Sequence, residues 1–129
     1  LGDGRVIANL VPQALKNADL TVYGDGKQTR SLCYVSDMVK GLHKFMNAEG
    51  LTGPINLGNP HELTVLEIAK KIIGLTNSKS KIVFRPLPIH DPAKRCPDIT
   101  LAKTKLNWEP AVKLEEGLKN TIDYFKKVL

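Results

Sequence analysis

The alternation of short apolar segments with longer amphipathic ones constrains the fold of this chain most. Apolar side chains at spacings of three and four predict helices, and short β-branched runs bounded by glycine or proline predict strands. The predicted helices lie at 6–15, 36–46, 65–73, 98–107 and 114–129, and the predicted strands at 20–23, 31–35, 55–58 and 81–84. The expected order is helix, strand, strand, helix, strand, helix, strand, helix, helix, which is typical of an α/β chain.

Local signals predict where several of these elements begin and end. Thr64 and Glu67 form a capping box at the start of one helix, and Asn107 suits the left-handed position that closes another. Ser36 is a plausible N-cap, and Pro12 either kinks the first helix or marks its regular start. The helix after Ser36 is expected to have an inner face of Met38, Val39, Leu42, Phe45 and Met46.

Length and charge limit the classes of function. With 129 residues, the chain is expected to form a single domain, 1–129. It begins without methionine, so we expect it to be cut from a longer protein. No apolar run approaches the ~20 residues that span a bilayer, so no membrane partner is expected in this segment. The charge of +6 favours anionic partners, but the lysines are scattered and aromatics are only 5%. We therefore expect no nucleic-acid partner, while a small basic nucleic-acid or protein-binding module stays open as an alternative.

The residues alone predict no catalytic centre and no metal site. Gly24 and Gly26 lack the third glycine and the following helix of a dinucleotide loop, so they predict a turn. Tyr23 and Lys27 have the Tyr-x-x-x-Lys spacing, but two glycines between them argue against the helix that such a pair needs. Cys33 and Cys96 are far apart, which predicts reduced thiols rather than a disulfide or a metal cluster.

No histidine has a recognisable catalytic partner either; the three are His43, His61 and His90. Arg30 and Arg95 are the candidates for an anion site, because a guanidinium group binds phosphate oxygens in a bidentate way. Taken alone, each fits a surface arginine better than a phosphate ligand. The residues by themselves therefore indicate an α/β domain and leave anion binding open.

A family resemblance extends this interpretation. Residues 3–9, 20–31 (LTVYGDGKQTRS) and 34–37 resemble consecutive motifs of the extended short-chain dehydrogenase/reductase family. Residues 53–60, 91–100, 108–110 and 114–118 follow in the same order as in that family. Within the family the combination is most similar to the UDP-glucuronate decarboxylases. The dTDP-glucose 4,6-dehydratases and UDP-sugar 4-epimerases share several of the same motifs and stay open as alternatives.

The resemblance implies a fold, an activity and a cofactor. It implies the substrate-binding C-terminal lobe of an extended Rossmann-type enzyme, without the N-terminal dinucleotide-binding half. The parent enzyme would use NAD, held mostly by that other half, to convert UDP-glucuronate to UDP-xylose with loss of CO2. The fragment alone would be inactive and bind no cofactor, since the Gly-rich loop and the catalytic Tyr-x-x-x-Lys pair belong to the other half. The parent is expected to be a homodimer, and a chain stripped of the N-terminal half is expected to self-associate. The implied location is cytoplasmic, or the Golgi lumen if the missing part carries an anchor.

The resemblance also implies roles for individual residues in binding a UDP-sugar. Thr21, Val22 and Tyr23 would line the nucleotide-base pocket, and Arg30 and Arg95 would converge on the diphosphate. Arg5 matches a position near the cofactor. Two departures from the family pattern bear on these roles. Cys96 stands where a second basic residue is common, and Pro12 interrupts the helix that follows Arg5.

Overall fold

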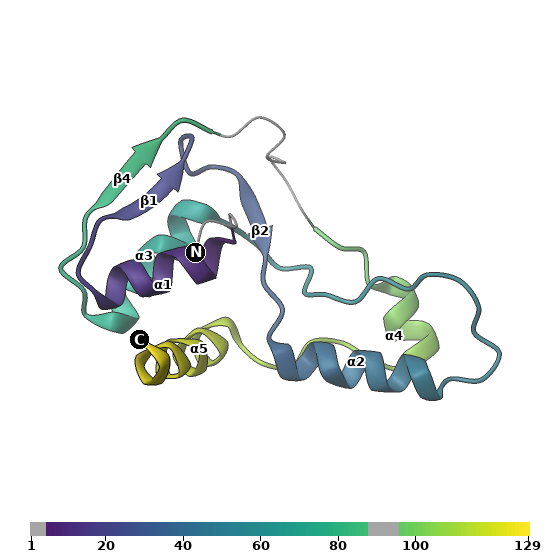
Figure 1. Cartoon of the computed structure of the whole chain (residues 1–129). Coiled ribbons are helices and arrows are strands. Elements are labelled where there is room, and N and C mark those ends of the chain that lie inside the picture. The colour runs from purple at the N-terminus through teal and green to yellow at the C-terminus, as the bar shows by residue number, and fades with distance from the viewer. Residues whose placement is uncertain (1–4, 88–95) are drawn as a thin grey trace. The chain divides into compact units, whose positions relative to one another are not determined.

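The structure, a computed structural model, describes residues 5–87 and 96–129. Its elements follow the predicted order (Figure 1). They are α1 (Val6–Leu15), β1 (Leu20–Tyr23), β2 (Thr29–Ser31), α2 (Val35–Asn47), β3 (Glu62–Thr64), α3 (Val65–Thr76), β4 (Ile82–Arg85), α4 (Thr100–Leu106) and α5 (Leu114–Val128). The chain divides into two compact units. Unit 1 comprises Leu1–Thr29, Leu63–Lys94 and Leu118–Leu129, and unit 2 comprises Arg30–Glu62 and Arg95–Gly117.

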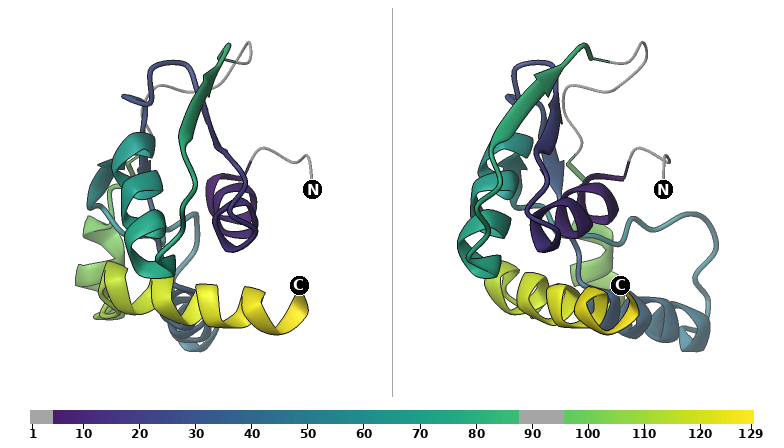
Figure 2. Two further views of the ribbon diagram at one scale, coloured as in Figure 1. Left: turned by 90° about the vertical axis from the view of Figure 1, so that its left-hand side faces the viewer. Right: turned by 60° about the vertical axis from the view of Figure 1, so that its left-hand side comes forward.

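Unit 1 is built around a parallel pair of strands. β1 pairs with β4 so that Leu20 lies opposite Ile82 and Tyr23 opposite Arg85. Helices α1 and α3 pack against each other and against β1 (Figure 2). Their buried apolar side chains remove the inner face of the strand pair from water, which is the main favourable term in the stability of such a layer. The buried residues are Leu10, Val11, Ala14, Leu20, Val22, Val65, Ile68, Ala69 and Ile72.

The ends of the helices in unit 1 follow the sequence signals closely. The Thr64 hydroxyl accepts a hydrogen bond from the Glu67 N–H at 3.1 Å, which confirms Thr64 as the N-cap of α3. Helix α3 ends at Asn77, whose φ of +51° is the left-handed conformation of a C-cap. Helix α1 begins at Val6 and includes Pro12, so the regular part does not start at the proline.

Unit 2 is held together by a cluster around Trp108. Ile99, Ala102, Leu106 and Trp108 are buried together, and the half-buried Cys33, Phe45, Ala48, Leu51, Ile55 and Leu57 pack on them. Helix α2 approaches this cluster through Gly41, where an added Cβ would lie 3.0 Å from Trp108 Cε2. Helix α4 ends at Asn107 in the left-handed conformation, as predicted (φ +48°).

Three local predictions in and around unit 2 are wrong. Residues 55–58 form no strand; the third strand is β3, at Glu62–Thr64. The predicted strand 31–35 is shorter, because β2 ends at Ser31 and Val35 already belongs to α2. Ser36 is not the N-cap, since Tyr34 holds that position and its carbonyl accepts the N–H groups of Asp37 and Met38.

The predicted inner face of α2 is also partly wrong. Met38 and Phe45 are half-buried as expected, but Val39, Leu42 and Met46 are exposed. The helix therefore carries a second apolar face that unit 2 does not bury. Of the helices in residues 5–87 and 96–129, none has both the length and the apolar character needed to cross a membrane.

Candidate functional site

The carboxyl end of the parallel strand pair presents an aromatic and a cationic side chain side by side. Tyr23 is the last residue of β1 and Arg85 the last of β4, and the two are paired in the register. Tyr23 is 39% exposed, and both Phe84 and Arg85 are exposed as well. In open α/β sheets, ligands bind at this end of the strands. An aromatic ring next to a guanidinium group suits the base and phosphate of a nucleotide.

The turn after Tyr23 is fixed by hydrogen bonds from a buried glutamine. Gln28 Nε2 donates to the Tyr23 carbonyl oxygen at 2.7 Å, and the Gln28 carbonyl accepts the Val65 N–H at 2.9 Å. The Gly26 carbonyl accepts the Leu66 N–H at 3.1 Å. The main chain at Tyr23 is therefore attached, through the turn, to the first residues of α3.

These contacts also decide what the amino end of α3 can bind. The first N–H groups of a helix have no partner within the helix and commonly attract anions. Here the N–H groups of Val65, Leu66 and Glu67 donate to the Gln28 carbonyl, the Gly26 carbonyl and the Thr64 hydroxyl, respectively. A phosphate group would have to displace these bonds, so we do not assign an anion site to this end of α3.

The neighbours of Tyr23 on β1 differ in what they offer a ligand. The Gln13 side chain forms two bonds with Thr21: its Nε2 donates to the Thr21 hydroxyl at 3.2 Å, and its Oε1 accepts the Thr21 N–H at 3.1 Å. The Thr21 hydroxyl still has its own proton to donate. The Val22 side chain is fully buried, so a contact from Val22 to a ligand would come from its main chain.

The three arginines predicted to bind ligand lie in different places. Arg5 is exposed at the N-cap of α1, where its carbonyl accepts the Asn9 N–H. Arg30 is half-buried on β2 and belongs to unit 2, whereas Tyr23 belongs to unit 1. Arg95 lies outside the described residues. The convergence of Arg30 and Arg95 on one diphosphate therefore stays a prediction.

Sequence reasoning missed two residues of this region, Gln28 and Arg85. Each is an ordinary polar residue in the sequence, and only the pairing of β1 with β4 and the fold of the turn place them at Tyr23. The signal that could have found Arg85 is its place at the end of a predicted strand, because parallel strands end at a common edge.

Unit 2 has a depression of about 410 Å³ beside α2, with Lys40, His43, Lys44 and Trp108 among its lining residues. Its polar groups are largely used within the protein. Lys44 Nζ donates to the Asn107 carbonyl at 2.8 Å, and Asp37, also in the lining, accepts the Val112 N–H at 2.9 Å. We therefore interpret the depression as a hollow in the surface over the Trp108 cluster and not as a ligand-binding site.

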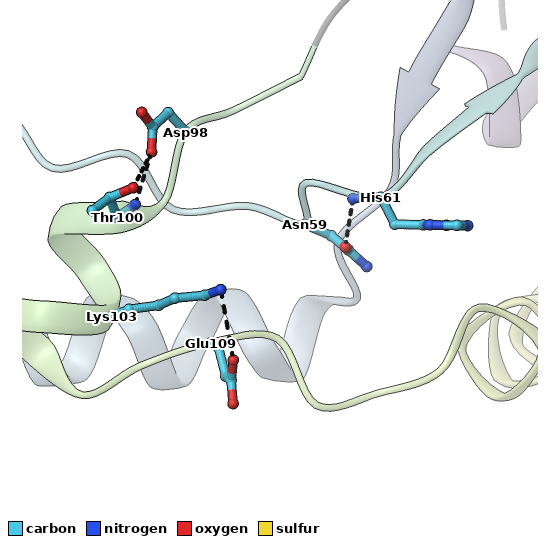
Figure 3. A network of polar contacts seen from close by, with 6 residues as sticks. All are labelled: Asn59, His61, Asp98, Thr100, Lys103 and Glu109. Atoms are coloured by element: carbon cyan, nitrogen blue, oxygen red, sulfur yellow. Dashed lines mark hydrogen bonds and ion pairs between the residues drawn. The ribbon is translucent and has the colours of Figure 1, made fainter.

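Polar side chains on α4 and on the neighbouring loops form local contacts within unit 2 (Figure 3). Asp98 accepts hydrogen bonds from the hydroxyl and the N–H of Thr100, and these bonds hold the pKa of Asp98 below its usual value. The Asn59 side chain accepts the His61 N–H at 3.0 Å, and Lys103 forms an exposed ion pair with Glu109 at 4.0 Å. Among residues 5–87 and 96–129, no three His, Cys, Asp or Glu side chains gather as metal ligands would.

The two cysteines are expected to differ in reactivity. Burial, and then the negative charge of Asp37, raise the pKa of the half-buried Cys33 thiol, whereas Cys96 is exposed. Iodoacetamide reacts with the thiolate, so at pH 8 Cys33 should be alkylated at least about ten times more slowly than Cys96. Peptide mass spectrometry over time measures both rates, and the protein unfolded in urea, in which the two rates should converge, is the control. Faster labelling of Cys33 in the folded protein would contradict the prediction.

The same raised pKa implies a pH dependence of stability. The folded state holds the Cys33 proton more tightly than the unfolded state does. The contribution of the Cys33 thiol to the free energy of unfolding is therefore complete at neutral pH. It is lost as the pH rises past the ordinary thiol pKa toward the raised one.

Comparison with known proteins places this geometry in a family. The family model described as GDP-mannose 4,6 dehydratase matches residues 3–121. The chain is 52% identical, over all 129 residues, to UDP-glucuronic acid decarboxylase 1 of Danio rerio, of which it covers 31%. It is 52% identical over 127 residues to UDP-glucuronic acid decarboxylase 4 of Arabidopsis thaliana, of which it covers 28%. The chain thus spans about a third or less of the length of these curated relatives.

Solved structures with the same arrangement include two epimerases. A UDP-glucose 4-epimerase of Thermotoga maritima, determined with UDP-glucose, superposes with a TM-score of 0.93 at 35% identity over 98% of this chain and 41% of the epimerase. A UDP-glucuronic acid 4-epimerase of Bacillus cereus, in complex with UDP-glucuronic acid and NAD, superposes with a TM-score of 0.92 at 26% identity, again over 98% and 41%. The predicted α/β class is confirmed, as a part of a larger short-chain dehydrogenase/reductase fold. Because the family model matches nearly the whole chain, the chain belongs to the GDP-mannose 4,6 dehydratase family of short-chain dehydrogenase/reductase proteins.

Proposed function

We propose that this chain is the nucleotide-sugar-binding, C-terminal part of an NAD-dependent UDP-glucuronate decarboxylase that makes UDP-xylose. The observation that carries the proposal is the identity of 52% across all 129 residues to a protein named as such a decarboxylase. The structural likeness to an epimerase holding UDP-glucuronic acid and NAD supports the same substrate and cofactor.

In the proposed reaction, the sugar is oxidised at C4, the resulting β-keto acid loses its carboxylate as CO2, and C4 is then reduced. NAD would supply this chemistry by accepting the hydride and returning it. We assign none of these steps to residues of this chain. The part that the chain does not span would hold most of the cofactor, and Arg5 is the position proposed to lie near it.

The residues of this chain would hold the nucleotide. Tyr23, anchored through its carbonyl by Gln28, would form the wall of the base pocket together with the Thr21 hydroxyl and the Val22 main chain. Arg30 and Arg95 would neutralise the diphosphate by forked hydrogen bonds. Arg85, next to Tyr23 at the strand ends, is a further cation that this arrangement offers.

The test of the proposed activity is CO2 release from UDP-glucuronate by the intact protein with NAD. Formation of UDP-xylose together with CO2 supports the proposal. Turnover of UDP-glucuronate to its 4-epimer without CO2, or turnover of dTDP-glucose only, would replace the decarboxylase by an epimerase or a dehydratase. The likeness to two epimerase structures is the specific reason for keeping the epimerase as the second candidate.

Loss of a diphosphate-binding arginine should weaken UDP-sugar binding selectively. We expect Arg30→Ala and Arg95→Ala each to reduce affinity for UDP by about 1–3 kcal/mol, because a charge-assisted hydrogen bond is lost at each. Isothermal titration of the intact protein measures this effect. The matched control is Lys127→Ala, which removes an equal charge from the exposed C-terminal end of α5. A similar loss in all three variants, with a steep salt dependence, would instead indicate the basic binding module.

A further inference from the structure

Two segments of unit 2 that are far apart in the sequence meet at Gly58. One segment precedes β3, and the other leads into α4. Gly58 is buried, and a Cβ added to it would lie 2.8 Å from Cγ and 3.4 Å from Cβ of the half-buried Pro97 ring. The Cys96 thiol donates to the Pro60 carbonyl oxygen at 3.2 Å. We call these two contacts, Gly58 with Pro97 and Cys96 with Pro60, the loop junction.

The loop junction is anchored in the core of unit 2 from both sides. Leu57, which precedes Gly58, packs on the Trp108 cluster, and Ile99, two residues after Pro97, belongs to that cluster. The segment before β3 is shaped further by the Asn59 side chain, which accepts the His61 N–H at 3.0 Å (Figure 3). Neither segment can therefore shift at the junction without disturbing contacts of the core.

The loop junction is next in sequence to a residue proposed to bind the ligand. Arg95 itself lies outside the described residues, but a peptide bond joins it to Cys96. Successive Cα atoms are about 3.8 Å apart, so a fixed position of Cys96 restricts where the main chain of Arg95 can lie. Arg30, the other arginine proposed for the diphosphate, belongs to the same unit as the junction. A displacement of the junction would therefore be passed on to position 95.

The close approach at Gly58 leaves no room for a side chain. Carbon atoms that are not bonded to each other pack best at about 3.5–4.0 Å. An alanine Cβ at 2.8 Å would therefore have to push the Pro97 ring away by roughly 0.7 Å or more. Because the ring is closed onto the main chain, this push moves the main chain at Pro97 as well. Ligand-binding groups have to be held to within about 0.5 Å, so a displacement of this size matters for a site beside it.

We propose that Gly58, Cys96 and Pro97 are positioning residues for the diphosphate of the nucleotide sugar, because the loop junction fixes the main chain to which Arg95 is attached. The inference rests on the proposed function, since it takes the diphosphate as the ligand of Arg95. None of the three positioning residues is assigned a contact with the ligand. Position 96, where the family pattern commonly has a basic residue, would thus act in this chain through its bond to Pro60.

The test is a double-mutant cycle in the intact, longer protein, with UDP and uridine as the probes. Gly58→Ala should weaken UDP binding at least about fivefold, because it misplaces a charge-assisted contact with the diphosphate. It should leave uridine binding unchanged, since uridine carries no phosphate. In the Arg95→Ala background, Gly58→Ala should cause no further loss of UDP affinity, because the group that it displaces is absent. Isothermal titration measures these affinities.

Gly74→Ala is the matched control. Neither Gly58 nor Gly74 has a left-handed φ, and no atom lies within 4 Å of a Cβ added at Gly74. This variant should leave the affinities for UDP and for uridine unchanged. Pro97→Ala is a second variant that serves if Gly58→Ala does not fold. It removes the ring from the loop junction without introducing a clash, and the same selective loss of UDP affinity is expected.

Three outcomes would overturn this inference alone. They are an equal loss of UDP and uridine affinity in the junction variants, the same loss of UDP affinity with and without Arg95, and a loss in Arg95→Ala but none in either junction variant. If UDP does not bind, or binds equally well to the Arg95→Ala variant, the proposed diphosphate site is wrong and the inference falls with it. None of these readouts uses turnover, so a protein that shows the selective loss yet releases no CO2 retains the inference and loses the proposed decarboxylase activity.

Discussion

Replacing Gly26 with alanine is expected to destabilise the protein by about 2–5 kcal/mol, through two effects that act at the same atom. The φ of Gly26 is +75°, a conformation that costs an L-residue roughly 1–2 kcal/mol. An added Cβ would also lie 3.0 Å from Leu66 Cβ and 3.0 Å from Val22 Cγ1. Overpacking of this kind costs about 1–3 kcal/mol, because neither the buried strand nor the start of α3 can move away freely.

Gly50→Ala is the matched control for Gly26→Ala. Gly50 has nearly the same φ, +73°, but no atom within 4 Å of an added Cβ. This variant should therefore show the backbone effect alone, about 1–2 kcal/mol. Urea denaturation followed by far-UV circular dichroism measures both free energies of unfolding. Equal losses in the two variants would contradict the close approach of the turn to α3.

The functional consequence of Gly26→Ala should follow from the same contacts. The turn holds Tyr23 through Gln28, and the Gly26 carbonyl accepts the Leu66 N–H. A shift of the turn therefore moves the strand end that is proposed to bind the base, and UDP affinity should fall in the Gly26 variant but not in the Gly50 variant.

The sequence predicts the elements of this fold well wherever a local signal is sufficient. The turn at Gly24 and Gly26, the cap at Thr64 and the end of α4 at Asn107 are all confirmed, and each depends on residues within a few positions. The failures are non-local. Residues 55–58 have a strand pattern, but a strand forms only where a partner is available, and β propensity alone does not supply one. Periodicity likewise shows that α2 is apolar on a broad arc and cannot tell which part of it unit 2 buries.

The candidate site could be predicted only in part, for a related reason. Tyr23 at a strand end and the arginines as phosphate ligands follow from residue types and from the family resemblance. Gln28 and Arg85 do not, since their proximity to Tyr23 is created by the parallel pairing of β1 with β4, which are separated by about half of the chain. The structure was also needed to decide whether the start of α3 can bind an anion. A sequence shows where a helix begins, but it does not show whether the first N–H groups of that helix already have hydrogen-bond partners.

Trp108→Ala should cost about 3–5 kcal/mol, because it empties the centre of unit 2. Trp108 is 3% exposed, and its Nε1–H donates to the Asp37 carbonyl at 2.9 Å. The loss combines the transfer free energy of a large aromatic side chain with the cavity that it leaves. Trp108→Phe retains most of the ring volume and removes the hydrogen bond, so we expect a smaller loss, about 1–2 kcal/mol. Because Trp108 is the chain's one tryptophan, unfolding is followed by circular dichroism rather than by fluorescence.

A double-mutant cycle with Gly41 distinguishes the cavity from a general loss of structure. Gly41→Ala alone should destabilise the protein, since the new Cβ would lie 3.0 Å from Trp108 Cε2 and 3.1 Å from Leu57. In the Trp108→Ala background the ring is gone, and an alanine in mid-helix gains roughly 0.5–1 kcal/mol over glycine. Gly41→Ala should therefore be less destabilising there, where only the close contact with Leu57 remains, with a coupling free energy of about 1–3 kcal/mol between the two positions. Strictly additive losses would show that α2 does not pack on Trp108 through Gly41.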